Sequence, residues 1–246
     1  MTISEGSPKD PHPERLTPNQ EILADMLFET KQMAPVTRRM GESGNYKFEK
    51  VERLTSPIDF ARENEFALKL HENQPDAPLS PVYINLRNLP GEVAGQVGFV
   101  MAELTMDTPA DFCAGIPKAG IPLAEAYSRH SGIPIANAFA KEETGERRRI
   151  VSGGEELTGA NLRLIDDLAT GGETKLEAIK AAEELGAIVV DVVVLVDRQQ
   201  GAKEQLGESG YKLKSAFTLD QLLRYGVRKG KITKVQYERV REYLGL

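Results

Sequence analysis

Two adjacent carboxylates, Asp166 and Asp167, end an apolar run, and a turn containing Gly171 and Gly172 follows at once. A helical pattern begins immediately after this turn, from Lys175 onward. Backbone N–H groups at a helix start are unsatisfied and bind anions, and glycines let the backbone approach a phosphate closely. Carboxylates instead accept hydrogen bonds from sugar hydroxyls or bind a cation. The combination of donors and acceptors in one turn indicates a site for a ribose 5-phosphate group.

Alternating strand and helix patterns surround this turn. The spacing predicts strands at 82–86, 111–115, 133–139, 162–166 and 188–197, and helices at 93–103, 123–130 and 174–185. Such repeated units predict an α/β fold, with a mainly parallel twisted sheet and helices on both faces. Ligands in these sheets bind beyond the carboxyl ends of the strands. Asp166, Lys118 and Arg198 all fall at predicted strand ends, so we expect them at one edge.

The flanking segments complete the expected organisation. A helix is predicted from Pro18, with Thr17 as its N-cap, and two final helices at 218–228 and 233–244. Residues 34–46 are interpreted as a mixed linker, 63–71 as a strand or short helix, and 73–80 as a loop. We expect an N-terminal extension or hood at residues 1–60, beginning with a loose tail, and one main domain at 61–246.

Composition limits the classes of function. Of the 246 residues, 28% are charged and 40% hydrophobic, which is typical of a soluble globular protein. The net charge of -6 argues against a nucleic-acid partner. The single cysteine, Cys113, excludes an internal disulfide and is expected to be a small buried hydrophobic residue. We see no run of membrane-spanning length and no apolar signal-peptide core, so we expect no membrane partner and a cytoplasmic location.

The residues from Leu162 to Thr174 resemble the phosphoribosyl-diphosphate (PRPP) loop of type I phosphoribosyltransferases. Three further stretches resemble the orotate phosphoribosyltransferase family: Ser80 to Arg87 (SPVYINLR), Gly115 to Ala124 (GIPKAGIPLA) and Val192 to Gly201 (VVVLVDRQQG). The resemblance extends from about Phe66 to the C-terminus. It implies a type I phosphoribosyltransferase-like fold and an enzyme that converts PRPP and orotate into orotidine 5′-phosphate and pyrophosphate. It also implies a homodimer and Mg²⁺ carried by PRPP, with no direct protein ligand.

The resemblance assigns roles to particular residues. The implied PRPP-binding residues are Lys69, Lys118, Ala119, Lys141, Asp166, Asp167, Leu168, Ala169, Thr170, Gly171, Gly172, Glu173 and Thr174. The implied orotate-binding residues are Tyr83, Ile84, Thr170 and Arg198. The implied catalytic residues are Asp166, Asp167, Lys141 and Arg147. A carboxylate beside a phosphate is repulsive, so we expect the side chain of Glu173 to point away.

The segment from Ala140 to Arg149 departs from the family's catalytic loop. Lys141 and Glu142 match, but the leading arginine is Ala140, the catalytic lysine position falls on Thr144, and the histidine is missing. Arg147 to Arg149 either restore the positive charge or form a solvated charge run. Two alternative functions therefore stay open: a phosphoribosyltransferase for another base, and a PRPP-binding regulatory protein without turnover.

Other interpretations remain beside these assignments. Lys118 and Lys69 are each equally consistent with a solvated surface lysine. Arg198 either pairs with a substrate carboxylate or forms an internal ion pair with Asp197 or another neighbour.

Overall fold

The computed structural model describes residues 15–144, 147–154 and 156–246, and for residues 69, 70, 141–144 and 147–149 it describes only the backbone. The residues predicted as a loose tail, 1–14, lie outside this range. The centre is a four-stranded parallel sheet with the order β10-β9-β8-β5. Its strands are β5 (Phe112–Gly115), β8 (Asn161–Ala169), β9 (Ile188–Asp197) and β10 (Leu213–Thr218). The predicted parallel sheet is thus confirmed.

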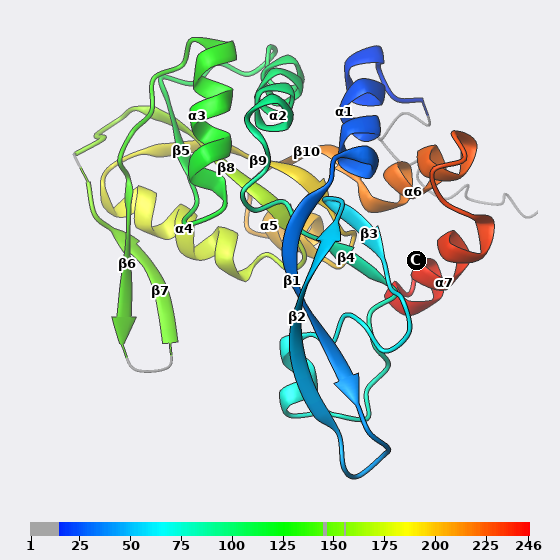
Figure 1. Ribbon diagram of the computed structural model, residues 1–246. Helices are drawn as coiled ribbons and strands as arrows, with labels where there is room; N and C mark the ends of the chain where they lie inside the picture. The colour runs from blue at the N-terminus through cyan, green and yellow to red at the C-terminus, as the bar shows by residue number, and fades with distance from the viewer. Residues whose placement is uncertain (1–14, 145–146, 155) are drawn as a thin grey trace, which may run out of the picture.

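Alternate side chains of β9 enter two separate cores. Val193 and Leu195 pack with α2 (Gly91–Leu104) and α3 (Gly120–Ser131), whereas Val192 and Val194 pack with α4 (Glu173–Glu184) and α5 (Ala202–Glu208). A strand that buries both faces is nearly continuously apolar, as this one is. Figure 1 shows α3 on one side of the sheet and α4 on the other, which confirms that helices cover both faces.

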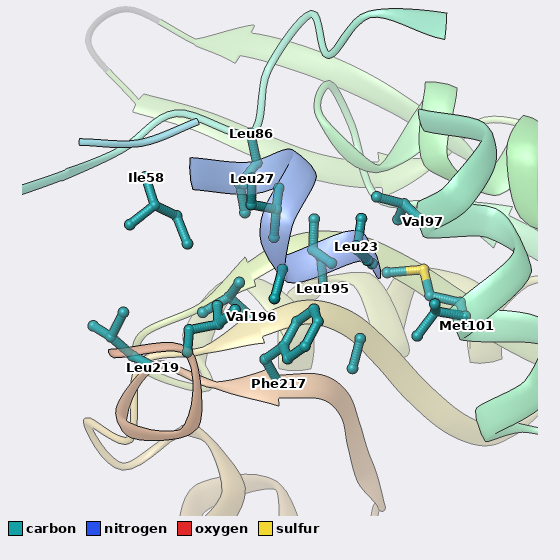
Figure 2. Close-up of a cluster of buried hydrophobic side chains, with 14 of the residues drawn as sticks. Leu23, Leu27, Ile58, Leu86, Val97, Met101, Leu195, Val196, Phe217 and Leu219 are labelled. Carbon is teal, nitrogen blue, oxygen red and sulfur yellow. The ribbon is translucent and has the colours of Figure 1, made fainter. Parts of the chain in front are cut away.

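The first helix, α1 (Pro18–Glu29), is confirmed, with Thr17 as the N-cap of a capping box. Its side chains Leu23 and Leu27 are fully buried in the same core as Val97, Met101 and Phe217 (Figure 2). Helix α1 therefore packs directly on the main core. The division into residues 1–60 and 61–246 stays a prediction.

The linker predicted at residues 34–46 is wrong. Strand β1 (Gln32–Met40) pairs antiparallel with β2 (Lys47–Thr55), and this hairpin extends away from the sheet (Figure 1). A second antiparallel pair joins β3 (Ile58–Phe60) to β4 (Val82–Ile84). The β1–β2 hairpin escaped prediction because much of its surface is solvated, so its strands carry many charged residues and lack clear apolar alternation.

The strand predicted at 133–139 is also wrong. There Ile135 forms only an isolated bridge to Cys113, and Pro134 lacks the N–H that a continuous ladder requires. Phe139 instead begins β6 (Phe139–Thr144), which pairs antiparallel with β7 (Arg147–Ser152). Cys113 is buried as expected, and burial raises the pKa of its thiol to about 11.

The remaining elements lie near the C-terminus and before β4. Helices α6 (Leu219–Arg228) and α7 (Lys234–Leu244) confirm the two predicted final helices. The segment predicted as a strand or short helix contains a 3-10 helix at Lys69–Glu72. Among the described residues, no helix has the length and apolarity needed to cross a membrane.

A buried ion pair connects β8 to β9 far from the carboxyl ends of these strands. Arg163 Nε lies 2.6 Å from Asp191 Oδ1, and its Nη2 donates to Asp191 Oδ2 at 2.8 Å. The hydroxyl of Tyr127 accepts a further bond from Arg163 Nη1 at 2.6 Å. Both charged side chains are fully buried, so each depends on the other for its stabilisation.

Candidate active site

The acidic doublet lies within β8, which continues beyond the predicted strand end at Asp166 as far as Ala169. Asp166 is buried and its Oδ2 lies 2.8 Å from Nζ of Lys175, in the first turn of α4. Its other oxygen, Oδ1, accepts the backbone N–H of Asp167 at 2.9 Å. The Asp167 carboxyl group lies close to Asp166, because a hydrogen bond between the two side chains is among the causes that raise the pKa of Asp167.

The pKa of Asp167 is strongly shifted from its ordinary value. Burial, and then the adjacent charge of Asp166, raises the pKa of Asp167 to about 7. Lys175 and Arg87 act in the opposite direction, but they do not outweigh these two causes. A carboxyl group that titrates near neutrality exchanges its proton readily when a polar ligand binds, and such shifts are concentrated at functional sites.

The turn after β8 resembles an anion site, although one of its amides is already occupied. The N–H of Gly172 donates to Oε1 of Gln205 in α5 at 2.7 Å. The N–H groups of Gly171 and Thr174 have no acceptor among the described residues. These two donors, at the N-terminus of α4, are available to a phosphate.

The expectation that Glu173 points away is wrong. A Cβ placed on Gly171 would lie 2.4 Å from Oε2 of Glu173, so the carboxylate folds back over the turn. The physical reason is attraction between a carboxylate and the positive end of the helix that it begins. The carboxylate of Glu173 therefore lies beside Gly171 in the turn.

The loop after β5 packs directly on the acidic doublet. Ile116 N–H donates to the carbonyl of Ile165 at 2.8 Å, and a Cβ on Gly120 would lie 2.2 Å from that same oxygen. Only glycine permits this approach. The loop thus brings Lys118, which is exposed, and Ala119 to the same edge as Asp166, as predicted from the strand ends.

A cavity of about 1230 Å³ lies beyond the ends of β8 and β9. Thr170 and Arg198 line one part of it, and the Arg198 N–H donates to the Ala169 carbonyl at 2.9 Å, which connects the two strand ends. Nε of Arg198 is buried and has no hydrogen-bond acceptor in the part of the chain that the structure describes, and burial lowers the pKa of this guanidinium. A buried donor without a partner is costly, so this cavity favours an anionic ligand.

The predicted base contacts Tyr83 and Ile84 do not line this cavity. Tyr83 stacks on Phe66 with ring centroids 4.9 Å apart, and its hydroxyl donates to the Pro35 carbonyl at 3.3 Å. Ile84 packs against the main core. Ser80 and Pro81, which precede them in the same segment, line the cavity instead. The binding of a base by Tyr83 and Ile84 stays a prediction.

Three predicted residues have side chains outside the described part of the structure: Lys69, Lys141 and Arg147. The backbone of Lys141 pairs with Ile150, and that of Thr144 with Arg147, in the β6–β7 hairpin. Their predicted contacts stay predictions.

Sequence reasoning missed Lys175, Gln205 and three residues of α7 that line the cavity: Arg239, Glu242 and Tyr243. A signal was available for Lys175, because it precedes the buried Ala178 and Ile179 by three and four positions and so shares their face of the helix. A lysine on a buried face requires a partner, which here is Asp166.

No family model matches the chain. A curated protein named orotate phosphoribosyltransferase from Methanopyrus kandleri is 42% identical over 113 residues, which are 46% of this chain and 60% of the relative. One of the same name from Aquifex aeolicus is 30% identical over 183 residues, covering 71% of this chain and 97% of the relative. Among solved structures, UMP synthase from Leishmania donovani has a TM-score of 0.63 and 34% identity, covering 77% of this chain and 39% of that one. The match thus spans less than two thirds of the Methanopyrus relative.

Proposed function

This chain belongs to the orotate phosphoribosyltransferase family, and on that premise we propose that it transfers ribose 5-phosphate from PRPP to orotate. The products are orotidine 5′-phosphate and pyrophosphate. One observation carries the proposal: Arg198 lines the same cavity as Thr170, which follows the end of β8, and its buried Nε has no acceptor among the described residues. A guanidinium fork matches a planar carboxylate such as that of orotate.

The neighbouring residues suit the sugar and its phosphates. We assign the ribose hydroxyls to Asp166 and Asp167, and the 5-phosphate to the turn from Thr170 to Thr174. N1 of orotate loses its proton to solvent and bonds to C1 of the ribose while the C1–oxygen bond to pyrophosphate breaks, and positive charge develops on the ribose ring. The doublet stabilises that charge, while Lys118 and the amides of its loop receive the departing anion.

Mg²⁺ is proposed as the cofactor, brought by PRPP. The described residues contain no group of three or more His, Cys, Asp or Glu side chains that could hold a metal. The doublet is the only acidic pair that we assign to the substrate, and Asp166 already pairs with Lys175, which fits an ion held mainly by the substrate. The ion would neutralise charge on the pyrophosphate.

We further propose a homodimer located in the cytoplasm. The β6–β7 hairpin supports the first part, because it extends beyond the central sheet (Figure 1). Light scattering of the purified chain tests the dimer, since a mass near 27.1 kDa would contradict it. Cell fractionation tests the location.

The proposed activity is tested by incubating the chain with Mg²⁺, PRPP and orotate and recording the loss of orotate absorbance. The variant with both Asp166→Asn and Asp167→Asn should lose turnover while its far-UV circular dichroism is retained. Asp107→Asn is the matched control, because Asp107 is exposed and far from the doublet in the chain. Turnover of a different base alone, or PRPP binding without product from any base, would refute orotate as the substrate.

A further inference from the structure

One face of α7 forms part of the wall of the cavity. Arg239, Glu242 and Tyr243 all line it, and their spacing of three and four positions places them on one side of the helix. Ser80 and Pro81 also line this cavity. The cavity is therefore enclosed partly by the last helix of the chain, which is distant in sequence from both the acidic doublet and the glycine turn.

Helix α7 is fixed in place rather than loosely attached. Val240 is fully buried in the main core, and Thr233 begins the helix with a capping box. The Tyr237 hydroxyl donates to Asp220 Oδ1 at 3.0 Å. These contacts hold the cavity-lining face at a defined distance from the sheet.

Asp220 also connects α7 to the Arg198 loop. The N–H of Asp220 donates to Oε1 of Gln199 at 3.2 Å, and the N–H of Gln199 donates to Asp197 Oδ1 at 2.8 Å. Tyr243 and Arg198 line the same cavity. The guanidinium and the helix face therefore form two sides of one subsite.

We propose that α7 recognises the base, with Glu242 accepting a ring N–H, Arg239 donating to a ring carbonyl, and Tyr243 covering the ring. This inference rests on the proposed function and names the residues that select its base. A pyrimidinedione that carries a carboxylate presents a ring N–H, ring carbonyls and a planar ring, together with the carboxylate that Arg198 would bind. The negative charge of Glu242 repels that carboxylate and Arg198 attracts it, which favours the orientation that places the carboxylate at Arg198.

The test measures the KM for orotate and the KM for PRPP separately in Glu242→Gln, Arg239→Gln and Tyr243→Phe. We expect the KM for orotate to rise about tenfold in the first two variants, while the KM for PRPP stays within about twofold, because a hydrogen bond to a charged group is lost at the base alone. Tyr243→Phe should have little effect, since the ring is kept. Glu238→Gln is the matched control, because Glu238 does not line the cavity and pairs with Lys234.

A second measurement uses 3-methylorotate, which lacks the ring N–H that Glu242 would accept. The unaltered chain should prefer orotate to this analogue by about tenfold, and Glu242→Gln should remove the preference. Kinetics of Glu242→Gln and Arg239→Gln that match those of Glu238→Gln would overturn the inference while leaving the proposed function intact. Absence of orotate turnover in the unaltered chain would refute the proposed function and this inference together.

Discussion

The ammonium group of Lys175 lies 2.8 Å from Oδ2 of Asp166, and it also donates to the carbonyl of Leu168 at 2.5 Å. One side chain in the first turn of α4 thereby contacts both the acidic doublet and the strand segment that leads into the glycine turn. The start of the helix and the end of the strand are held together independently of any ligand. Asp166 is committed to this ion pair, and Asp167 is the carboxylate with no protein cation at bonding distance among the described residues.

Replacing Lys175 tests this arrangement. Lys175→Met should lower the free energy of unfolding by about 3 kcal/mol, because it leaves the buried carboxylate of Asp166 without a cation. Adding Asp166→Asn removes that charge, and the double variant should recover about 1 kcal/mol or more. Urea unfolding of the four chains measures the coupling. Strictly additive losses would show that the two side chains do not depend on each other.

The raised pKa of Asp167 predicts a pH-dependent stability. Because the folded chain binds this proton more tightly than the unfolded chain, the contribution of Asp167 to stability is fully present below about pH 4 and is lost as the pH rises to about 7. Asp167→Asn should therefore be more stable than the unaltered chain at pH 8, by roughly 2 kcal/mol after allowance for solvent screening. The gap should narrow at pH 5. Denaturant midpoints of both chains between pH 5 and pH 8 measure this difference in stability. A difference that does not change with pH would contradict the raised pKa of Asp167.

Asp107 should show the opposite dependence of stability on pH, and it serves as the comparison. A hydrogen bond from Lys214 lowers the pKa of Asp107, so its contribution is present above its ordinary pKa and is lost as the pH falls. Asp107→Asn should thus be less stable than the unaltered chain near neutrality, and the difference should disappear in acid.

The guanidinium fork of Arg198 predicts a selective kinetic defect. Arg198→Lys keeps the charge but removes the planar pair of donors, so the KM for orotate should rise about 30-fold while the KM for PRPP changes little. Initial rates at varied orotate and fixed PRPP, and the reverse, separate the two constants. Arg129→Lys, at the exposed end of α3, should match the unaltered chain. Equal effects on both substrates would place Arg198 outside the base subsite.

The close approach at Gly120 predicts a difference between two glycines. Gly120→Ala forces a methyl group against the carbonyl of Ile165 and should cost about 1–3 kcal/mol while reducing turnover, because the loop must move away from Asp166. Gly95→Ala, in α2, meets nothing within 4 Å and should be neutral or stabilise by about 0.5–1 kcal/mol. Thermal unfolding and orotate turnover of both variants provide the comparison. Identical behaviour of the two variants would refute the packing argument.

Apolar runs and helix-capping residues are strong local signals, so the sequence predicts most strands of the sheet and the helices around it. Strand β9 is a continuous β-branched run, and Thr17, Thr218 and Thr233 each begin a helix with a capping box. The β1–β2 hairpin and β10 were missed, since they carry polar residues and their pairing depends on partners elsewhere. Strand pairing is a long-range property that local periodicity does not encode.

The residues of the candidate site also fall into two groups: those that local motifs predict and those that only the tertiary structure brings together. Asp166, Thr170 and Arg198 follow from motifs at strand ends, where topology alone brings them to one edge. Gln205 could not be found, because its role depends on where the unpredicted helix α5 packs against Gly172. Arg239, Glu242 and Tyr243 carry no motif, and only the tertiary arrangement places them beside a turn about seventy residues earlier in the chain.

The bidentate contact between Arg163 and Asp191 has a consequence for the opposite end of β8. A slip of β8 by one residue against β9 would separate two desolvated charges and, at the same time, exchange the directions of Asp166 and Asp167. The free energy needed to separate Arg163 from Asp191 therefore also opposes the slip that would reorient Asp166 and Asp167. The ion pair at one end of β8 thus fixes the register on which the proposed active site at the other end depends.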